Sequence, residues 1–363
     1  MIRILALEPY YGGSHKAFID GWSSRSRHAW NLLSLPAYKW KWRMRHSAMT
    51  FAHQLQPSSA DYQVLFCSDM LNLAEFRGLA PARIAALPTV IYFHENQLTY
   101  PVRHASERDY HFSLTNISSA LAATAVWFNS AYNRDSFLDA ALALLQQMPD
   151  HQPLNAIDQI RAKTAVFAPG IDESPPQKPR EPGPIRLLWA ARWEHDKNPG
   201  LFFDALKALK AQGVDFRLSV IGEQFRDAPQ IFAQAKLEFQ DHIDRWGYQA
   251  GRSIYAQVLS TADVFVSTAE HEFFGISAAE AIEAGAYPLL PERLAYPELV
   301  GGDEFFYDGT PEQLTQRLAS LAQRVNDGNL WGDDPNRARR QVQRVTWPAL
   351  VTQLDDAIRQ VVS

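Results

Sequence analysis

Two carboxylates and a group of backbone amides gather in the stretch HEFFGISAAEA. Glu272 and Glu280 are eight residues apart. A helix that begins near Gly275 places Glu280 in its second turn and Glu272 in the loop ahead of it. The amides of Phe274, Gly275 and Ile276 then lack partners within the helix and attract an anion such as phosphate. Carboxylates beside such a site can hold sugar and ribose hydroxyls. Acidic residues that only complement the helix dipole are an equally good interpretation.

Two cations lie in a second stretch, ARWEHDKNP. Arg192 and Lys197 fall in an expected strand-to-helix turn, and Pro199 suits the first turn of the helix. A guanidinium fork and an ammonium point charge at one strand end fit a diphosphate. On these residues alone, a surface ion pair with Glu194 or Asp196 is the preferred interpretation.

Two glycines follow the first strand-like run, in EPYYGGSHK. Gly12 and Gly13 allow the backbone to approach another group closely. Ser14 is expected to cap the helix that follows. His15 and Lys16 are candidates for contacts with a phosphate or with an acceptor.

The run TVIYFHENQ ends on His94. A lone histidine at the end of an apolar strand is often a core residue with its hydrogen bonds satisfied. Strand ends face the ligand in parallel α/β sheets, so we favour a functional His94. Asn96 and Gln97 suit acceptor contacts and loop stabilisation equally well.

Residues 21–60 contain no acidic side chain, although the chain as a whole has a net charge of -5. Cations follow nucleic-acid phosphates, and aromatic rings stack on unpaired bases. The densest part is YKWKWRMRH, whose alternation also fits an amphipathic strand with its tryptophans inward. Because the charged side would be purely basic, we favour contact with RNA. The candidates are Lys39, Lys41, Arg43 and Arg45.

All these stretches follow apolar, strand-like runs that alternate with helix-like segments, which predicts doubly wound α/β domains. We expect an N-terminal acceptor-side domain at 1–172, a proline-rich linker at 173–184 and a nucleotide-sugar domain at 185–345. A helix at 346–363 is expected to pack back on the first domain. Ligands bind outside the carboxyl ends of parallel strands, so the site should lie in a cleft between the two domains.

The composition narrows the class of protein. The chain has 363 residues, of which 46% are hydrophobic and 21% are charged. The hydrophobic and charged shares exclude a disordered chain, and the net charge of -5 excludes a wholly basic nucleic-acid binder. Cys67 is the single cysteine, and no Cys/His spacing indicates zinc. We expect a cytoplasmic protein with no membrane segment and no obligate protein partner. The chain has no Asp-x-Asp pair, so we expect no metal.

The spacing Arg-x4-Lys followed by Glu-x7-Glu resembles that of the retaining GT-B glycosyltransferases related to glycogen synthase. Five longer strings resemble the tRNA-queuosine mannosyltransferase family: LEPYYGGSHK, YFHENQLTYP, FNSAYNRDSFL, RWEHDKNP and HEFFGISAAEA. The resemblance covers nearly the whole chain. It implies two Rossmann-like domains that face a cleft, and transfer of mannose from GDP-mannose to the cyclopentenediol of queuosine in tRNA, with the α configuration kept.

The resemblance also implies roles for single residues. Arg192 and Lys197 would bind the donor diphosphate and stabilise it as the leaving group. Glu272 would hold hexose hydroxyls, Glu280 the nucleotide ribose, and His94 would lie near the transferred sugar. The other implied donor contacts are Gly12, Gly13 and the backbone of Phe274, Gly275 and Ile276. No cofactor beyond the co-substrate is implied.

Three other functions are weighed against this one; two stay open and the third is discounted. One is a retaining GT-B enzyme with another nucleotide sugar and a non-RNA acceptor. An enzyme with a lipid acceptor is expected to carry an amphipathic helix at the membrane surface. The tryptophans of the basic stretch have a period of two rather than helical spacing, which disfavours such a helix. Another alternative is a non-catalytic RNA- or nucleotide-binding protein on the same fold. A dehydrogenase is discounted, because GGSHK lacks the three-glycine fingerprint. Glu223, Gln224 or the segment around Trp246 is a candidate for contact with the nucleotide base.

Overall fold

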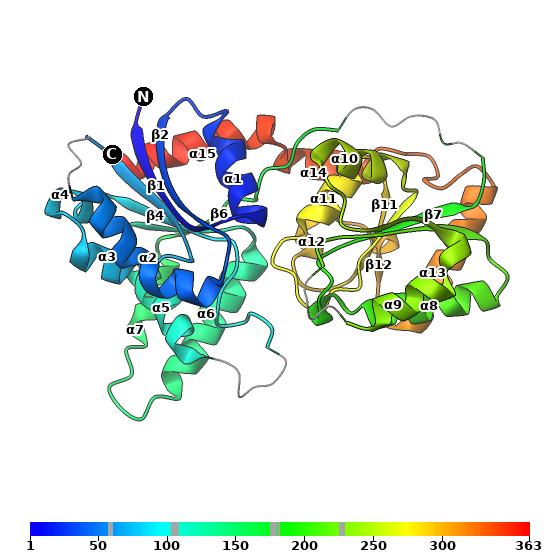
Figure 1. The fold of residues 1–363 in the computed structure, drawn as a ribbon, viewed down its shortest axis with the longest axis horizontal. Coiled ribbons are helices and arrows are strands. Elements are labelled where there is room, and N and C mark those ends of the chain that lie inside the picture. The colour runs from blue at the N-terminus through cyan, green and yellow to red at the C-terminus, as the bar shows by residue number, and fades with distance from the viewer. Residues whose placement is uncertain (57–60, 103–108, 175–179, 181, 225–228) are drawn as a thin grey trace. The chain divides into compact units, whose positions relative to one another are not determined.

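The computed structural model describes the chain except residues 57–60, 103–108, 175–179, 181 and 225–228. The chain divides into two compact units (Figure 1). Unit 1 comprises Met1–Gly170 together with Trp347–Ser363, and unit 2 comprises Ile171–Thr346. Half of the proline-rich segment expected at 173–184, namely residues 175–179 and 181, lies outside the described residues.

Unit 1 is built on a parallel sheet of six strands in the order β2-β1-β3-β4-β5-β6. The order reverses between β1 and β3, so the loops after these two strands diverge. The strands are β1 Arg3–Tyr11, β2 Ala29–Pro36, β3 Val64–Ser68, β4 Thr89–Phe93, β5 Ala125–Phe128 and β6 Thr164–Val166. The apolar runs predicted all of them except β2, an edge strand whose half-exposed residues AWNLLSLP include polar ones.

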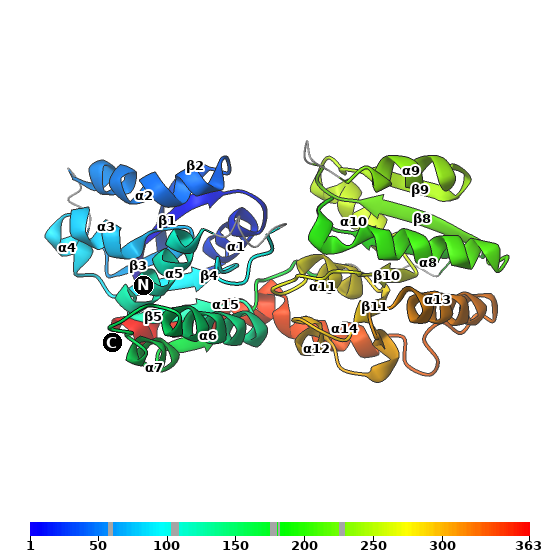
Figure 2. The same cartoon turned by 90° about the horizontal axis from the view of Figure 1, so that it is seen from below.

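Helices cover both faces of this sheet (Figures 1 and 2). They are α1 Gly13–Ser23, α2 Trp40–Leu55, α3 Leu73–Leu79, α4 Ala82–Ala85, α5 Tyr110–Ala122, α6 Ala131–Gln146, α7 Asn155–Arg161 and α15 Trp347–Val362. Successive strand residues point to opposite faces. Leu65 and Cys67 of β3 therefore pack into the core with Phe51 of α2, while Phe66 meets Trp22 of α1 on the other face.

The two glycines after β1 have different structural reasons. A Cβ atom on Gly12 would lie 2.4 Å from the Cβ of Ala37, so only glycine fits against the segment after β2. Gly13 has a φ of 52°, in the left-handed region that favours glycine. Because α1 begins at Gly13 with Gly12 as its N-cap, the prediction that Ser14 caps this helix is wrong.

The last helix, α15, belongs to unit 1 and runs beside its sheet (Figures 1 and 2). Its first residue, Trp347, fills space that two glycines leave open, because Cβ atoms on Gly21 and Gly170 would lie 2.1 and 2.3 Å from the indole. Asp355, buried on the same helix, accepts hydrogen bonds from the Trp22 indole at 2.8 Å, the Ser26 hydroxyl at 2.7 Å and the Arg27 amide at 2.8 Å.

Unit 2 repeats the architecture with the strand order β12-β11-β10-β7-β8-β9. The order reverses between β7 and β10, and the loops after these strands carry the predicted cations and carboxylates. The strands are β7 Ile185–Ala190, β8 Phe216–Ile221, β9 Ile243–Gly247, β10 Val264–Val266, β11 Tyr287–Pro291 and β12 Phe306–Tyr307. The helices are α8 Pro199–Ala211, α9 Ile231–Glu238, α10 Arg252–Thr261, α11 Ile276–Glu283, α12 Tyr296–Leu299, α13 Pro311–Asn326 and α14 Arg337–Val342. Within the described part of the chain, no helix has the length and apolar character needed to span a membrane.

Candidate active site

Lys197 is the central cation of a pocket in unit 2. It ends a short 3-10 helix, His195–Lys197, after β7 and is largely buried. Its Nζ donates to the backbone oxygen of His271 at 2.6 Å and lies 2.9 Å from Asp196 Oδ2 and 3.6 Å from Glu272 Oε2. Burial lowers the pKa of Lys197, but the two carboxylates raise it above its usual value. The ammonium group therefore stays charged at neutral pH.

Lys197 and Glu272 line the same pocket, together with Ser277 and Tyr296 and the strand ends of β7 and β10. Glu272 lies in the loop after β10, and its side chain is 26% exposed. A fixed ammonium group and a carboxylate at the sheet's topological switch point can hold an anionic group and hydroxyl groups side by side.

The start of α11 agrees with the local prediction. Gly275 is the N-cap residue with a φ of 92°, and Glu280 lies in the second turn. A Cβ atom on Gly275 would also lie 2.9 Å from the Tyr296 ring. Both the left-handed backbone and the close packing therefore require glycine at this position. Phe274 is buried beside it.

Glu280 is held by α10, which the sequence analysis did not connect with the site. The Tyr255 hydroxyl donates to Glu280 Oε2 at 2.8 Å, and Arg252 Nη2 lies 3.0 Å from Oε1. Burial raises the pKa of Glu280, and the positive charge of Arg252 opposes this shift. No sequence pattern around residue 252 indicated these partners, because they lie 25 and 28 positions away from Glu280.

Two further candidates of unit 2, Arg192 and Glu223, lie nearer the surface. Arg192 forms the alternative ion pair considered above, 3.2 Å from Glu194, with 44% of its side chain exposed. A pair so exposed contributes little stability and is easily reorganised by a ligand. Glu223 is exposed, and its backbone oxygen accepts from the Trp193 amide at 3.0 Å.

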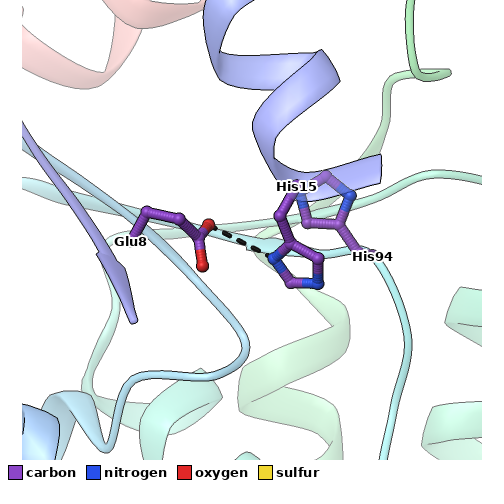
Figure 3. Close-up of side chains that lie close together, drawn as sticks. All are labelled: Glu8, His15 and His94. Carbon is purple, nitrogen blue, oxygen red and sulfur yellow. Dashed lines mark hydrogen bonds and ion pairs between the residues drawn. The ribbon is translucent and has the colours of Figure 1, made fainter. Parts of the chain in front are cut away.

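In unit 1, a buried charge cluster joins β1, α1 and the end of β4 (Figure 3). The Glu8 carboxylate points toward His15, with 3.2 Å between Oε2 and Nδ1, and the rings of His15 and His94 lie 4.0 Å apart. The other carboxylate oxygen of Glu8 accepts from the Tyr10 amide and the Ser68 hydroxyl at 2.8 and 3.0 Å.

The two histidines of this cluster have opposite charge states. Burial lowers the pKa of His15, but the negative charge of Glu8 outweighs it and raises the pKa to about 9. Burial and the positive charge of His15 both hold the pKa of His94 well below its usual value. His15 is therefore an imidazolium at neutral pH and His94 is a neutral ring.

His94 keeps one polar atom available for a ligand. Its backbone amide donates to Asp69 Oδ1 at 3.0 Å, and its backbone oxygen accepts from Asn129 at 2.8 Å. Among the described residues, its buried Nε2 atom has no hydrogen-bond partner. An unpaired buried polar atom costs free energy, so a substrate group that completes the hydrogen bond would be favoured.

Glu8, His15 and His94 are also residue types that bind metals, and their donor atoms all lie within 4.8 Å of one another. One carboxylate and two imidazoles suit Zn²⁺. A cation would have to displace the proton that Glu8 holds on His15, because a histidine ligand must be deprotonated.

His15→Gln should change how stability depends on pH. Folding raises the pKa of His15 from 6.5 to about 9. The stabilisation is therefore complete below pH 6.5 and is lost as the pH rises through about 9. The stability gap between the natural protein and His15→Gln should shrink by roughly 3 kcal/mol across this window. Urea unfolding at several pH values measures it, with exposed His53→Gln as the control. If the free energies of unfolding of the natural protein and His15→Gln vary with pH in parallel, His15 is not held as an imidazolium in the folded protein.

Of the acceptor candidates of unit 1, Asn96 and Gln97 are buried within the fold, whereas Lys16 lies on the surface. Asn96 is fully buried and stabilises its own loop, since Oδ1 accepts from the amides of Leu98 at 3.1 Å and Thr99 at 2.9 Å. Gln97 is largely buried, and its backbone amide donates to Asn116 Oδ1 at 2.8 Å. Lys16 is exposed on α1 and forms an ion pair with Asp20 one turn later.

The stretch YKWKWRMRH is helical from Trp40 onward, so the amphipathic-strand alternative is wrong. Lys39 precedes the helix as its N-cap, in the left-handed region with a φ of 52°. Arg43 is braced within the fold, because its Nε donates to the backbone oxygen of Pro36 at 3.0 Å. Lys41 and Arg45 are exposed. The argument that period-two spacing disfavours a helix at a membrane surface is therefore also wrong, because this segment is a helix.

Comparison with solved structures defines the fold. Sucrose-phosphate synthase from Thermosynechococcus elongatus matches over 99% of both chains with a TM-score of 0.72 and 15% identity. Anabaena Alr3699/HepE in complex with UDP matches 99% of this chain and 100% of its own, with a TM-score of 0.70 and 15% identity. With two parallel six-stranded sheets, this protein has the fold of the GT-B glycosyltransferases.

Sequence comparison identifies the family. Residues 3–171 match the family described as tRNA-queuosine alpha-mannosyltransferase N-terminal, and residues 170–329 match glycosyl transferases group 1. The tRNA-queuosine alpha-mannosyltransferase of Drosophila melanogaster is 39% identical over 87% of this chain and 86% of its own length. The chain belongs to the tRNA-queuosine alpha-mannosyltransferase family. A GDP-mannose-dependent alpha-(1-6)-phosphatidylinositol dimannoside mannosyltransferase of Mycobacterium tuberculosis is 28% identical over 52% of this chain and 51% of its own length.

Proposed function

We propose that this protein transfers mannose from GDP-mannose to the cyclopentenediol of queuosine in a tRNA anticodon, with retention of the α configuration. The observation that carries the proposal is the 39% identity to the Drosophila enzyme across both units. The name of the partly matching Mycobacterium relative supports GDP-mannose as the donor. We also propose that the reaction takes place in the cytoplasm.

The pocket of unit 2 suits the chemistry of the donor. Breaking a glycosyl–phosphate bond develops negative charge on the diphosphate, and a fixed cation in a site of low polarity stabilises that charge. Lys197 is such a cation, because three protein groups hold it and burial removes it from water. We assign the more exposed Arg192 to the same diphosphate, Glu272 to the hexose hydroxyls and Glu280 to the ribose.

Retention requires no second carboxylate nucleophile in this proposal. If the acceptor hydroxyl attacks from the face that the diphosphate leaves, a phosphate oxygen can accept its proton. The arrangement of two carboxylates used by hydrolases is then unnecessary. We assign His94 to the transferred sugar, which would complete the hydrogen bond of its neutral ring. No metal enters this scheme.

A transfer assay tests the proposal. The protein is incubated with GDP-mannose and tRNA that contains queuosine, and the digested nucleosides are analysed by mass spectrometry. The mass of one hexose should be added to queuosine. UDP-glucose as the alternative donor and tRNA without queuosine as the acceptor control should give none. If queuosine gains no hexose from either nucleotide sugar, the proposed function is wrong.

Arg192→Ala should lower the transfer rate roughly 100-fold, the effect of losing one charge-stabilising donor in a transition state. Arg217→Ala is a matched control, because Arg217 also forms a partly exposed ion pair in unit 2, with Asp244. The two variants are compared under single turnover with saturating donor. Equal rates in both variants would refute the diphosphate role of Arg192.

A further inference from the structure

Helix α2 and the two residues before it carry an exposed surface that the donor pocket does not use. Tyr38 and Trp42 expose 63% and 59% of their surface, and three exposed cations accompany them. We call this surface the basic–aromatic face and define it as Tyr38, Lys39, Lys41, Trp42 and Arg45. No acidic residue occurs from position 21 to 60, so the face has no negative charge from its own stretch of chain.

Helical geometry separates the two tryptophans of this stretch. Residues two positions apart in an α-helix point about 200° apart. Trp40 therefore turns inward and packs against Phe112, with 5.2 Å between the ring centroids. Trp42 turns outward, where it makes no contribution to the core. A strand would have placed both indoles on one side.

Trp42 is held in place by a fixed neighbour, the ring of His46. The two rings are stacked, with centroids 4.9 Å apart and planes 30° apart. Arg43 Nη1 lies 2.9 Å from His46 Nε2, and His46 Nδ1 lies 2.8 Å from the Thr50 hydroxyl. Arginine can only donate, so Nε2 accepts and Nδ1 carries the hydrogen.

This arrangement makes His46 a neutral, flat support. Protonating Nε2 would set two donors against each other, and burial together with the charge of Arg43 lowers the pKa of His46. Arg43 is in turn anchored to the backbone oxygen of Pro36. One side of the Trp42 ring thus rests on a braced imidazole, while more than half of its surface is open to solvent.

We propose that the basic–aromatic face binds single-stranded RNA, with an unpaired base stacked on Trp42 and the backbone phosphates beside Lys39, Lys41 and Arg45. An exposed, immobilised ring among cations is the arrangement by which proteins hold unpaired nucleotides. We take this RNA to be the anticodon loop of the acceptor tRNA, and that identity rests on the proposed function.

A membrane surface fits the same face less well. A helix that lies on a bilayer presents a continuous apolar side to the lipid. The apolar side of α2, formed by Met44, Ala48 and Phe51, is buried within unit 1. The exposed apolar or aromatic side chains here are Tyr38, Trp42 and Met49, and the exposed cations Lys39, Lys41 and Arg45 interrupt them, so they form no continuous apolar side.

The test uses two RNAs without queuosine and no sugar donor, measured by fluorescence anisotropy. One is an anticodon stem-loop and the other a fully paired duplex of the same length. Trp42→Ala should weaken stem-loop binding roughly 5- to 100-fold, the range of one base–aromatic stack, and leave duplex binding unchanged. Trp42→Phe should restore most of the affinity. Lys41→Ala should weaken binding of both RNAs and reduce the salt dependence for the loop.

Leu79→Ala, which truncates another exposed apolar side chain of unit 1, is the control and should bind both RNAs normally. Unchanged stem-loop binding by Trp42→Ala overturns the proposal, as does an equal loss for the two RNAs. Trp42-dependent binding to phosphatidylserine vesicles without RNA binding would instead indicate a membrane face. Because no queuosine or GDP-mannose is present, these outcomes are independent of whether hexose transfer occurs.

Discussion

Lys197→Met should reduce hexose transfer by about 1,000-fold or more, the upper range for loss of one charge-stabilising group in an active site. The side chain keeps its length but loses the ammonium group. Asp196 and Glu272 then lose the cation that lies 2.9 and 3.6 Å from them. The remaining negative charge would repel a diphosphate, so the donor should also bind more weakly.

Two measurements separate these effects. Single-turnover transfer at saturating donor reports the chemical step, and calorimetric titration with GDP reports the ground-state contact. Lys207→Met is the matched control, because Lys207 is a half-exposed lysine of the same unit that pairs with Asp204. Thermal unfolding of both variants checks that the fold persists. A folded Lys197→Met protein that transfers within tenfold of the natural rate would remove Lys197 from the mechanism.

Asp355→Ala should cost on the order of 3 kcal/mol in the stability of unit 1, because it leaves buried donors without their acceptor. The carboxylate is 2% exposed and accepts three hydrogen bonds from the segment that ends α1. The loss should appear as faster amide hydrogen exchange in α1 and α15 and as a lower urea midpoint.

The neighbouring residue supplies the control for this variant. Asp356 is exposed and forms an ion pair with Arg27 on the surface, so Asp356→Ala removes the same group one position along the helix. Its exchange pattern should stay close to that of the natural protein, because solvent replaces a surface ion pair. If the two variants lose equal protection, the buried Asp355 network does not anchor α15.

The residue patterns alone located the strands that end at the site. Apolar runs bounded by polar, glycine-rich segments predicted β1, β3, β4 and β7, and Gly275 predicted the start of α11. These features depend on a few neighbouring residues, so local sequence is sufficient. The half-polar edge strand β2 lacked such a run and was missed.

Local pattern was misleading in the basic stretch. Alternating cations and tryptophans have a period of two, yet the segment is the helix α2. Tertiary packing decides this, because Trp40 and Met44 join a buried cluster with Met70 and Phe112, and helical spacing brings these two inward without Trp42, which a strand would have placed on the same side. The same packing turns Trp42 outward, which no count of residues along the chain could predict.

The sequence by itself indicated the class of chemistry through the resemblance of its strand-end motifs to a glycosyltransferase family, because the cations and carboxylates alone fitted a surface ion pair or the helix dipole at least as well. Only the tertiary structure decided the state of those groups. Glu8 and Ser68, Tyr255 and Glu280, and Trp22 and Asp355 are 60, 25 and 333 positions apart. Charge state and orientation depend on such distant partners and on burial, and both exist only once the chain has folded.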